Sequence, residues 1–271
     1  MLMPSSPLTR ELSVAVRAAK AAGALQSRCR GRRIGYTTKR HAADLVTTVD
    51  RASERLIHTI IRTRFPEHGF YGEERTRTHR SSPWQWLVDP LDGTTNFVHG
   101  VPVFAVSIGL VHEGQPVLGV IYDPSYRELF TAVRGRGARL NGRRIHVSPT
   151  RRLADSLFST GFSVKFRRNP APYLRWFQAF QSRCHAVRRS GSTAISLAYV
   201  AAGRLEGFYE QDLWPWDIAA GIVLVEEAGG LVSDFRDRPV QFKVGEVVAS
   251  NGHLHTKMLT LLRRPVNPHP H

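Results

Sequence analysis

Apolar positions near the start of the chain recur at helical spacing. The first helix is predicted over Leu12, Ala15, Val16, Ala19 and Ala22. Thr9 stands where its side chain can cap that helix, and Gly31 and Gly35 then indicate a loop. A second helix, with Leu56, Ile57, Ile60 and Ile61 on one face, is predicted to begin around 47–50 and to stop before Pro66.

The central part of the chain has apolar runs separated by turn residues, which is typical of strands. The predicted strands are Trp86–Asp89, Val103–Val111, Val117–Tyr122, Glu128–Val133 and Arg143–Val147. The turn Glu113-Gly114-Gln115 joins the second strand to the third. Asn141-Gly142 is a strong hairpin signal, so we expect Glu128–Val133 to pair with Arg143–Val147.

Helical patterns return in the second half of the chain. The predicted helices are Pro172–Arg183, Ser192–Ala202, a helix from Pro215 to Gly229-Gly230, and a last helix at about 253–262. Alternating helices and strands, without an internal repeat or a clear linker, favour an α/β layered sandwich. We expect one domain over residues 1–264 and a disordered tail over residues 265–271.

The composition indicates a soluble globular protein. The chain has 271 residues, of which 42% are hydrophobic and 22% charged, so it can bury a large core. No apolar run approaches the roughly 20 residues of a membrane helix, and the first residues do not resemble a secretory signal. Cys29 and Cys184 form neither a disulfide framework nor a metal-binding spacing. We therefore expect a cytoplasmic protein with no membrane partner.

The charge is strongly basic, and this leaves two interpretations open. The formal net charge is +16, and the basic residues concentrate in residues 1–40, 127–152 and 162–190. Such a surplus can attract RNA, DNA or anionic substrates. It can equally be a solvated surface in a protein whose genome favours arginine codons, because Arg outnumbers Lys 33 to 5. No recognisable nucleic-acid-binding module accompanies the charge.

The most informative chemistry lies in the segment Asp89-Pro90-Leu91-Asp92-Gly93-Thr94-Thr95. Two carboxylates end an apolar stretch, and two hydroxyl residues open a short predicted helix. Hard divalent cations prefer such oxygen clusters, and a helix start offers unpaired N–H groups to an anion. A simple turn is the alternative for the aspartates. Two further acidic elements, Gly72-Glu73-Glu74 and Trp216-Asp217, favour a shared magnesium and phosphate site.

In these and other segments the chain resembles the inositol monophosphatase family, within the lithium-sensitive, magnesium-dependent phosphatase superfamily. The matching segments are Asp44-Leu45-Val46-Thr47-Thr48-Val49-Asp50, Gly72-Glu73-Glu74, Asp89 through Phe97, Gly191-Ser192-Thr193-Ala194, Pro215-Trp216-Asp217-Ile218-Ala219-Ala220-Gly221 and Glu226-Glu227-Ala228-Gly229-Gly230. The resemblance implies a sugar-phosphatase type of fold with alternating α-β-α-β-α layers, and a homodimer.

The resemblance also implies a role for each acidic residue. One Mg²⁺ would be held by Glu73, Asp89 and the backbone oxygen of Leu91, and a second by Asp89, Asp92 and Asp217. Glu73 would also support a third, loosely bound ion through waters. Thr94 and Asp50 would orient the metal-activated water, and the N–H groups of Gly93 and Thr94 would bind phosphate. Simpler interpretations are helix caps for Asp50 and Asp217.

The substrate side of the site is assigned by the same resemblance. Glu210 would accept hydrogen bonds from substrate hydroxyls, Asp92 would lie near the leaving oxygen, and Thr193 would line the pocket. Glu210 could instead be a solvated residue beyond a strand at Gly207–Tyr209. Lys39 matches a mobile-loop lysine of the family, although surface charge explains it equally well.

The implied reaction is hydrolysis of a sugar or polyol phosphate monoester, with myo-inositol monophosphate as the leading substrate. Water would attack directly, without a covalent intermediate. The alternatives on the same scaffold are a fructose-1,6-bisphosphatase and a histidinol-phosphatase. A different class of function is an RNA-associated regulatory protein that retains the fold.

Overall fold

The computed structural model describes residues 8–31, 35–38, 45–74, 76–79, 81–242 and 245–263. Lys39, Asp44 and the predicted tail 265–271 lie outside these residues. No helix in the described ranges combines the length and the apolar character needed to cross a membrane.

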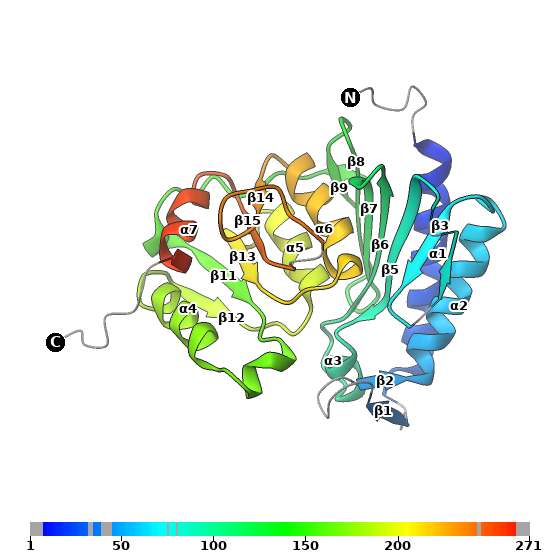
Figure 1. Cartoon of the computed structure of the whole chain (residues 1–271), viewed down its shortest axis with the longest axis horizontal. Coiled ribbons are helices and arrows are strands. Elements are labelled where there is room, and N and C mark those ends of the chain that lie inside the picture. Colours follow the sequence, from blue (N-terminus) through cyan, green and yellow to red (C-terminus); the bar gives the residue numbers. More distant parts are fainter. Residues whose placement is uncertain are drawn as a thin grey trace.

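Two long helices form the outer layer on one side of the larger sheet (Figure 1). They are α1 (Thr9–Cys29) and α2 (Thr48–Arg62), and their buried faces share one core with the sheet. The predicted cap at Thr9 is wrong, because Thr9 is already helical and Leu8 precedes the helix without a capping side chain. The second helix begins and ends as expected, and Thr47 caps it.

The larger sheet has eight strands in the described part of the chain, in the order β10-β9-β8-β7-β6-β5-β3-β4. Its neighbouring strands are antiparallel except for β3 and β5, which are parallel. The strands are β3 (Gly69–Gly72), β4 (Arg77–Thr78), β5 (Trp84–Asp92), β6 (Ala105–His112), β7 (Gln115–Asp123), β8 (Glu128–Val133), β9 (Ala138–Leu140) and β10 (Arg143–Arg144).

The predicted hairpin around Asn141-Gly142 joins different strands from those expected. Both turn residues have positive φ, as the hairpin signal requires, but β10 pairs with β9 and not with β8. The predicted strand Arg143–Val147 is also too long. The chain leaves the sheet after β10, and Val147 N–H donates to the carbonyl of Ala228, just after the helix Pro215–Glu227, at 3.1 Å.

Two buried helices, α5 (Thr193–Ala201) and α6 (Pro215–Glu227), form the middle layer between the sheets (Figure 1). Helix α6 approaches the larger sheet so closely that two strand positions require glycine. A Cβ on Gly109 would lie 2.7 Å from the Cβ of Ala219, and one on Gly119 would lie 2.3 Å from the carbonyl of Ala220. The close approach fixes where the start of α6 meets the sheet.

A five-stranded sheet and two further helices complete the layers. The strand order within the described residues is β12-β11-β13-β15-β14, and α4 and α7 cover the outer face. The elements are β11 (Leu157–Thr160), α4 (Ala171–Gln181), β12 (Ala186–Arg188), β13 (Gly207–Glu210), β14 (Leu231–Ser233), β15 (Val247–Ser250) and α7 (His255–Arg263). The layered α/β fold with α-β-α-β-α order is thereby confirmed.

The remaining elements are short. They are β1 (Tyr36–Thr38) and β2 (Leu45–Thr47), which pair with each other, α3 (Thr94–Val98), and the 3₁₀ turns η1 (Leu153–Asp155) and η2 (Val164–Arg167). Helix α3 follows β5 directly and is the short helix expected after the two aspartates.

Candidate active site

The acidic segment lies at the end of β5, where the strand bulges. Asp89 pairs with Ser107 and Asp92 with Ala105, so β5 carries one residue more than β6 over this stretch. Leu91 N–H donates to Asp89 Oδ1 at 2.9 Å, which fixes the buried Asp89 side chain. The bulge therefore places one extra residue in β5 between the two aspartates.

Gly93 connects β5 to α3 and cannot be replaced without strain. Its φ is 91°, in the left-handed region, and a Cβ would lie 2.8 Å from the carbonyl oxygen of Val103. The first N–H groups of α3 follow immediately. The glycine thus places backbone donors next to Asp92.

Asp50 and Thr94 form the predicted pair. Thr94 Oγ1 lies 2.8 Å from Asp50 Oδ1 and 3.0 Å from the carbonyl of Leu91. The other oxygen, Asp50 Oδ2, accepts the N–H of Thr47 at 2.9 Å and completes the cap of α2. Asp50 therefore both caps its helix and bonds to Thr94, so the two interpretations hold together. Burial raises the pKa of Asp50.

Asp92 is held by the start of α5. Its Oδ2 accepts hydrogen bonds from Ser192 Oγ and from Ala194 N–H, the latter at 2.8 Å. Burial raises the pKa of Asp92 to about 6 despite these bonds. Sequence reasoning gave Ser192 no role of its own, although it stands in the Gly191-Ser192-Thr193-Ala194 segment.

Asp217 lies in the first turn of α6, where Trp214 N–H donates to its Oδ2 at 2.7 Å. The helix-cap interpretation is therefore correct as far as it goes. Burial is also the first cause of a pKa of Asp217 well above its usual range, and the next is the charge of Glu73. Asp217 thus belongs to the same electrostatic group as the carboxylates of the larger sheet.

Asp89 lies at the centre of this group. Burial raises its pKa well above the usual range. The neighbouring charges that raise it further are Glu73, Asp92 and Asp217. The structure thus brings together four carboxylates from three separate segments, as expected.

The oxygens of the four carboxylates are not arranged as a complete set of metal ligands. Within the described ranges, no three His, Cys, Asp or Glu side chains meet in a geometry ready to hold a metal ion. Like charges repel one another. Asp89, Asp92 and Asp217 each accept a hydrogen bond from a backbone N–H, which holds the side chain in place against that repulsion. Burial, and after it the charges of Glu73, Asp92 and Asp217, raise the pKa of Asp89, and a cation bound to these oxygens would remove that repulsion.

Glu210 lies at the end of β13 and faces the carboxylates. Its Oε2 lies 3.3 Å from Thr193 Oγ1, which donates a hydrogen bond to it. Burial, with Asp92 as a further cause, raises the pKa of Glu210 to about 8. The alternative of a solvated residue beyond the strand is wrong, because Glu210 belongs to β13, is only partly exposed and accepts a hydrogen bond from Thr193.

Gln26 is a residue that the sequence analysis missed. Its side chain is fully buried, and its Nε2 donates to the carbonyl of Pro90 at 2.6 Å, between the two aspartates of β5. Its position on the inner face of α1 gave no sign of this contact, which joins residues 64 positions apart.

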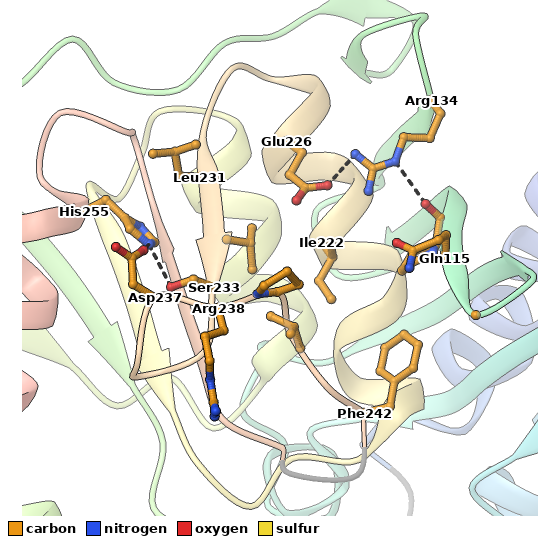
Figure 2. A pocket seen from close by; sticks show the side chains of 15 residues that line it. Gln115, Arg134, Ile222, Glu226, Leu231, Ser233, Asp237, Arg238, Phe242 and His255 are labelled. Atoms are coloured by element: carbon orange, nitrogen blue, oxygen red, sulfur yellow. Dashed lines mark hydrogen bonds and ion pairs between the residues drawn. The ribbon is translucent and has the colours of Figure 1, made fainter. Parts of the chain in front are cut away.

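A separate cavity of about 290 Å³ is lined by Ile222 and Glu226 of α6 (Figure 2). In its walls Arg134 bonds to Glu226, and His255 lies beside Asp237. Burial lowers the pKa of His255, whose Nε2 is 2.9 Å from Ser233 Oγ. None of the predicted site residues lines this cavity, so the acidic group at β5 remains the candidate active site.

The model of the inositol monophosphatase family matches residues 8–266. The chain belongs to this family. It is therefore a phosphatase of the inositol monophosphatase family. Its layered fold is that of the family's solved structures.

The relatives carry two kinds of name. The chain is 43% identical over 264 residues to "Nus factor SuhB" of Pseudomonas aeruginosa, covering 95% of this chain and 96% of that protein. It is 44% identical over 257 residues to "Inositol-1-monophosphatase" of Synechocystis sp., covering 93% and 88%. The crystal structure of the extragenic suppressor protein SuhB of Bartonella henselae has a TM-score of 0.91 at 40% identity, covering 95% and 100%.

Proposed function

We propose that this inositol monophosphatase family member is a magnesium-dependent hydrolase of a sugar or polyol phosphate monoester, with myo-inositol monophosphate as the leading substrate. The observation that carries the proposal is the meeting of Glu73, Asp89, Asp92 and Asp217 beside the backbone donors after Gly93, where burial and the neighbouring negative charges raise the pKa values of the three aspartates. A cation and a phosphate group together satisfy such a site.

The donor set fits Mg²⁺, because all its members are hard oxygen ligands. Glu73, Asp89 and the carbonyl of Leu91 would hold one ion, and Asp89, Asp92 and Asp217 a second. When bound, the ions supply positive charge to the phosphate oxygens and make a nearby water more acidic. This assignment follows the family resemblance and the electrostatics of the four side chains.

Thr94 and Asp50 would orient the attacking water. Because the Thr94 hydroxyl donates its hydrogen bond to Asp50 Oδ1, the Thr94 oxygen can accept a hydrogen bond from water and turn the water's lone pair toward phosphorus. The N–H groups of Gly93 and Thr94 would bind phosphate oxygens. Glu210, held by Thr193, would accept hydrogen bonds from ring hydroxyls and select polyols.

A substrate panel tests the proposal. Phosphate release is measured with myo-inositol 1-phosphate, fructose 1,6-bisphosphate and histidinol phosphate, each with Mg²⁺ and with a chelator. We expect Mg²⁺-dependent release that is fastest from inositol phosphate. Faster release from either other ester would assign that activity instead, and no release from any of them would contradict the proposal.

Lithium inhibition is expected from the same site, by the family resemblance. Li⁺ is a small hard cation suited to the oxygens of Asp89, Asp92 and Asp217, and it would hold phosphate in place after hydrolysis. The expected pattern in initial rates is therefore uncompetitive, or nearly so. NaCl at equal ionic strength is the control, and equal effects of the two salts would contradict an ordinary second cation site.

A second candidate function is association with RNA. It is favoured by the net charge of +16 and by relatives named Nus factor SuhB. Arg143 and Arg144 are exposed on the edge strand β10, whereas Arg32 and Arg33 lie outside the described residues. Enzyme and RNA-associated protein are compatible on one chain, because the basic edge strand and the acidic group are separate surfaces.

A salt titration distinguishes RNA association from a merely basic surface. We expect single-stranded and duplex RNA to bind weakly, without sequence preference, and to dissociate as salt rises, because nonspecific phosphate contacts weaken steeply with salt. Replacing Arg143 and Arg144 with Gln should lower binding to all RNA sequences alike in a gel-shift assay. Tight binding that survives physiological salt would instead support the second function.

We propose a cytoplasmic homodimer, from the family resemblance, and one domain over residues 1–264, which is supported by the packing of α5 and α6 between both sheets. Light scattering coupled to size-exclusion chromatography measures the oligomeric state directly.

A further inference from the structure

Helix α2 carries a second buried carboxylate that the proposed reaction does not use. Glu54 is 1% exposed and stands four residues after Asp50, so the two lie on the same face of the helix. A buried carboxylate is costly unless hydrogen bonds compensate for its lost water. Its partners therefore indicate what the residue does.

Both oxygens of Glu54 bind the turn that follows β3. Oε2 accepts the N–H of Glu74 at 2.6 Å, and Oε1 accepts the N–H of Thr76 at 3.0 Å. Glu73, the expected metal ligand, lies in this turn beside Glu74. Charge-assisted hydrogen bonds of this kind are stronger than neutral ones.

Backbone bonds account for the other described N–H groups of the turn. Gly72 N–H donates to the carbonyl of Thr76 at 2.9 Å, and Glu73 N–H donates to the carbonyl of Val88 on β5 at 3.1 Å. One side of the turn is thus tied to β5, and the other side is tied to α2 through Glu54. The position of Glu73 relative to Asp89 depends on both.

Gly72 makes the contact with α2 possible. A Cβ at this position would lie 2.2 Å from Glu54 Oε2, well inside contact distance, although the φ of Gly72 is not positive. The glycine of the Gly72-Glu73-Glu74 segment is thus required for space and not for a special backbone conformation.

We propose that Glu54 is a positioning residue for the metal site: it fixes the turn that presents Glu73 and thereby sets the affinity for the divalent cation. The inference rests on the proposed function, in which Glu73 is a metal ligand. One face of α2 then carries both residues: Asp50 bonds to Thr94 of the water-orienting pair, and Glu54 positions the metal ligand Glu73.

Binding of Mn²⁺ to the metal-free protein, followed by the loss of the free-ion signal in electron paramagnetic resonance, tests the proposal. Mn²⁺ prefers the same oxygen ligands as Mg²⁺. We expect Glu54→Gln to weaken Mn²⁺ binding roughly ten- to a hundredfold, as for groups that orient metal ligands from outside. The Gln side chain keeps one acceptor oxygen but presents an NH₂ group to the other backbone N–H.

Glu206→Gln is the matched control. Glu206 is also buried, and its Oε2 accepts the N–H of Leu157 at 2.6 Å, but it holds a segment of the smaller sheet. Both variants should lower the melting temperature, and only Glu54→Gln should weaken Mn²⁺ binding. Equal Mn²⁺ affinities in Glu54→Gln, Glu206→Gln and wild type would overturn the inference.

Glu73→Gln separates this inference from the proposed function. If Glu73→Gln leaves Mn²⁺ affinity unchanged, the metal assignment itself fails; if it weakens binding while Glu54→Gln does not, only the positioning role fails. Should Glu54→Gln not fold, Gly72→Ala tests the same contact, because its methyl group displaces the Glu54 carboxylate. A folded Gly72→Ala protein with wild-type Mn²⁺ affinity would also overturn the inference.

Discussion

Asp89→Asn is expected to reduce kcat by roughly a thousandfold or more while the fold is retained. Asp89 is the central carboxylate, expected to bind both cations, and metal ions contribute several kcal/mol of transition-state stabilisation. Asn keeps the Oδ1 acceptor for the Leu91 N–H, so the bulge of β5 should persist. The measurement is Mg²⁺-dependent phosphate release together with circular dichroism.

The control for Asp89→Asn is Asp155→Asn, which changes an exposed aspartate of η1. It should leave turnover at the wild-type level. Near-normal Mg²⁺-dependent activity of Asp89→Asn would show that Asp89 is not a shared ligand, and a loss of secondary structure would show that its role is in folding.

The metal-free Asp89→Asn protein is also expected to be more stable than metal-free wild type near neutral pH. The pKa of Asp89 is raised in the folded state, so the folded protein binds more protons than the unfolded chain between the two pKa values. This carboxylate therefore lowers stability as pH rises above its unfolded pKa of about 3.9. The gain in melting temperature should be largest at neutral to alkaline pH and should vanish at acid pH.

At a pH above the raised pKa of Glu210, where its carboxylate is charged, Glu210→Gln is expected to lower kcat/KM for inositol phosphate roughly ten- to a hundredfold, because losing a hydrogen bond to a charged group costs on the order of 1.5–3 kcal/mol. Hydrolysis of p-nitrophenyl phosphate, which lacks ring hydroxyls, should change far less, since Glu210 is not expected to hold metal. The comparison is kcat/KM for both substrates in wild type and variant.

The two substrates together decide the role of Glu210. An equal loss on both would point to a structural or metal-linked role, since Asp92 and Asp217 lie within its electrostatic reach. No loss on either would remove Glu210 from the site. Thr193→Val is the companion variant: it removes the hydroxyl that binds Glu210 Oε2 and should give a smaller loss in the same direction.

Local signals predicted most elements of the fold correctly. Strand Glu128–Val133 has the expected bounds, and α5 and α6 begin where Ser192 and Pro215 indicated. The errors occur where contacts distant in sequence decide the outcome. The strand after Gly142 stops early, and the backbone of Val147 bonds to Ala228, a partner that periodicity does not reveal.

The same distinction applies to the candidate site: its acidic segments could be found from the sequence, and the contacts that support them could not. The acidic segments could be found from sequence because metal and phosphate chemistry restricts residue types within a few neighbouring positions, as in the run from Asp89 to Thr94. The contacts that support them join distant positions: Ser192 bonds to Asp92, and Glu54 bonds to the turn of Glu73. Such partners are ordinary polar residues in helical patterns, so their spacing carries no sign of the contact.

The sequence by itself determined the family, the layered fold class and the acidic residues, because caps, turns and short-range motifs are written in neighbouring residues. The tertiary structure alone decided that the Glu210 carboxylate accepts a hydrogen bond from Thr193, that Asp50 both caps α2 and bonds to Thr94, and that Glu73, Asp92 and Asp217 lie close enough to Asp89 to raise its pKa. Burial and charge coupling depend on how the two sheets close over α5 and α6, and that packing brings together side chains far apart along the chain.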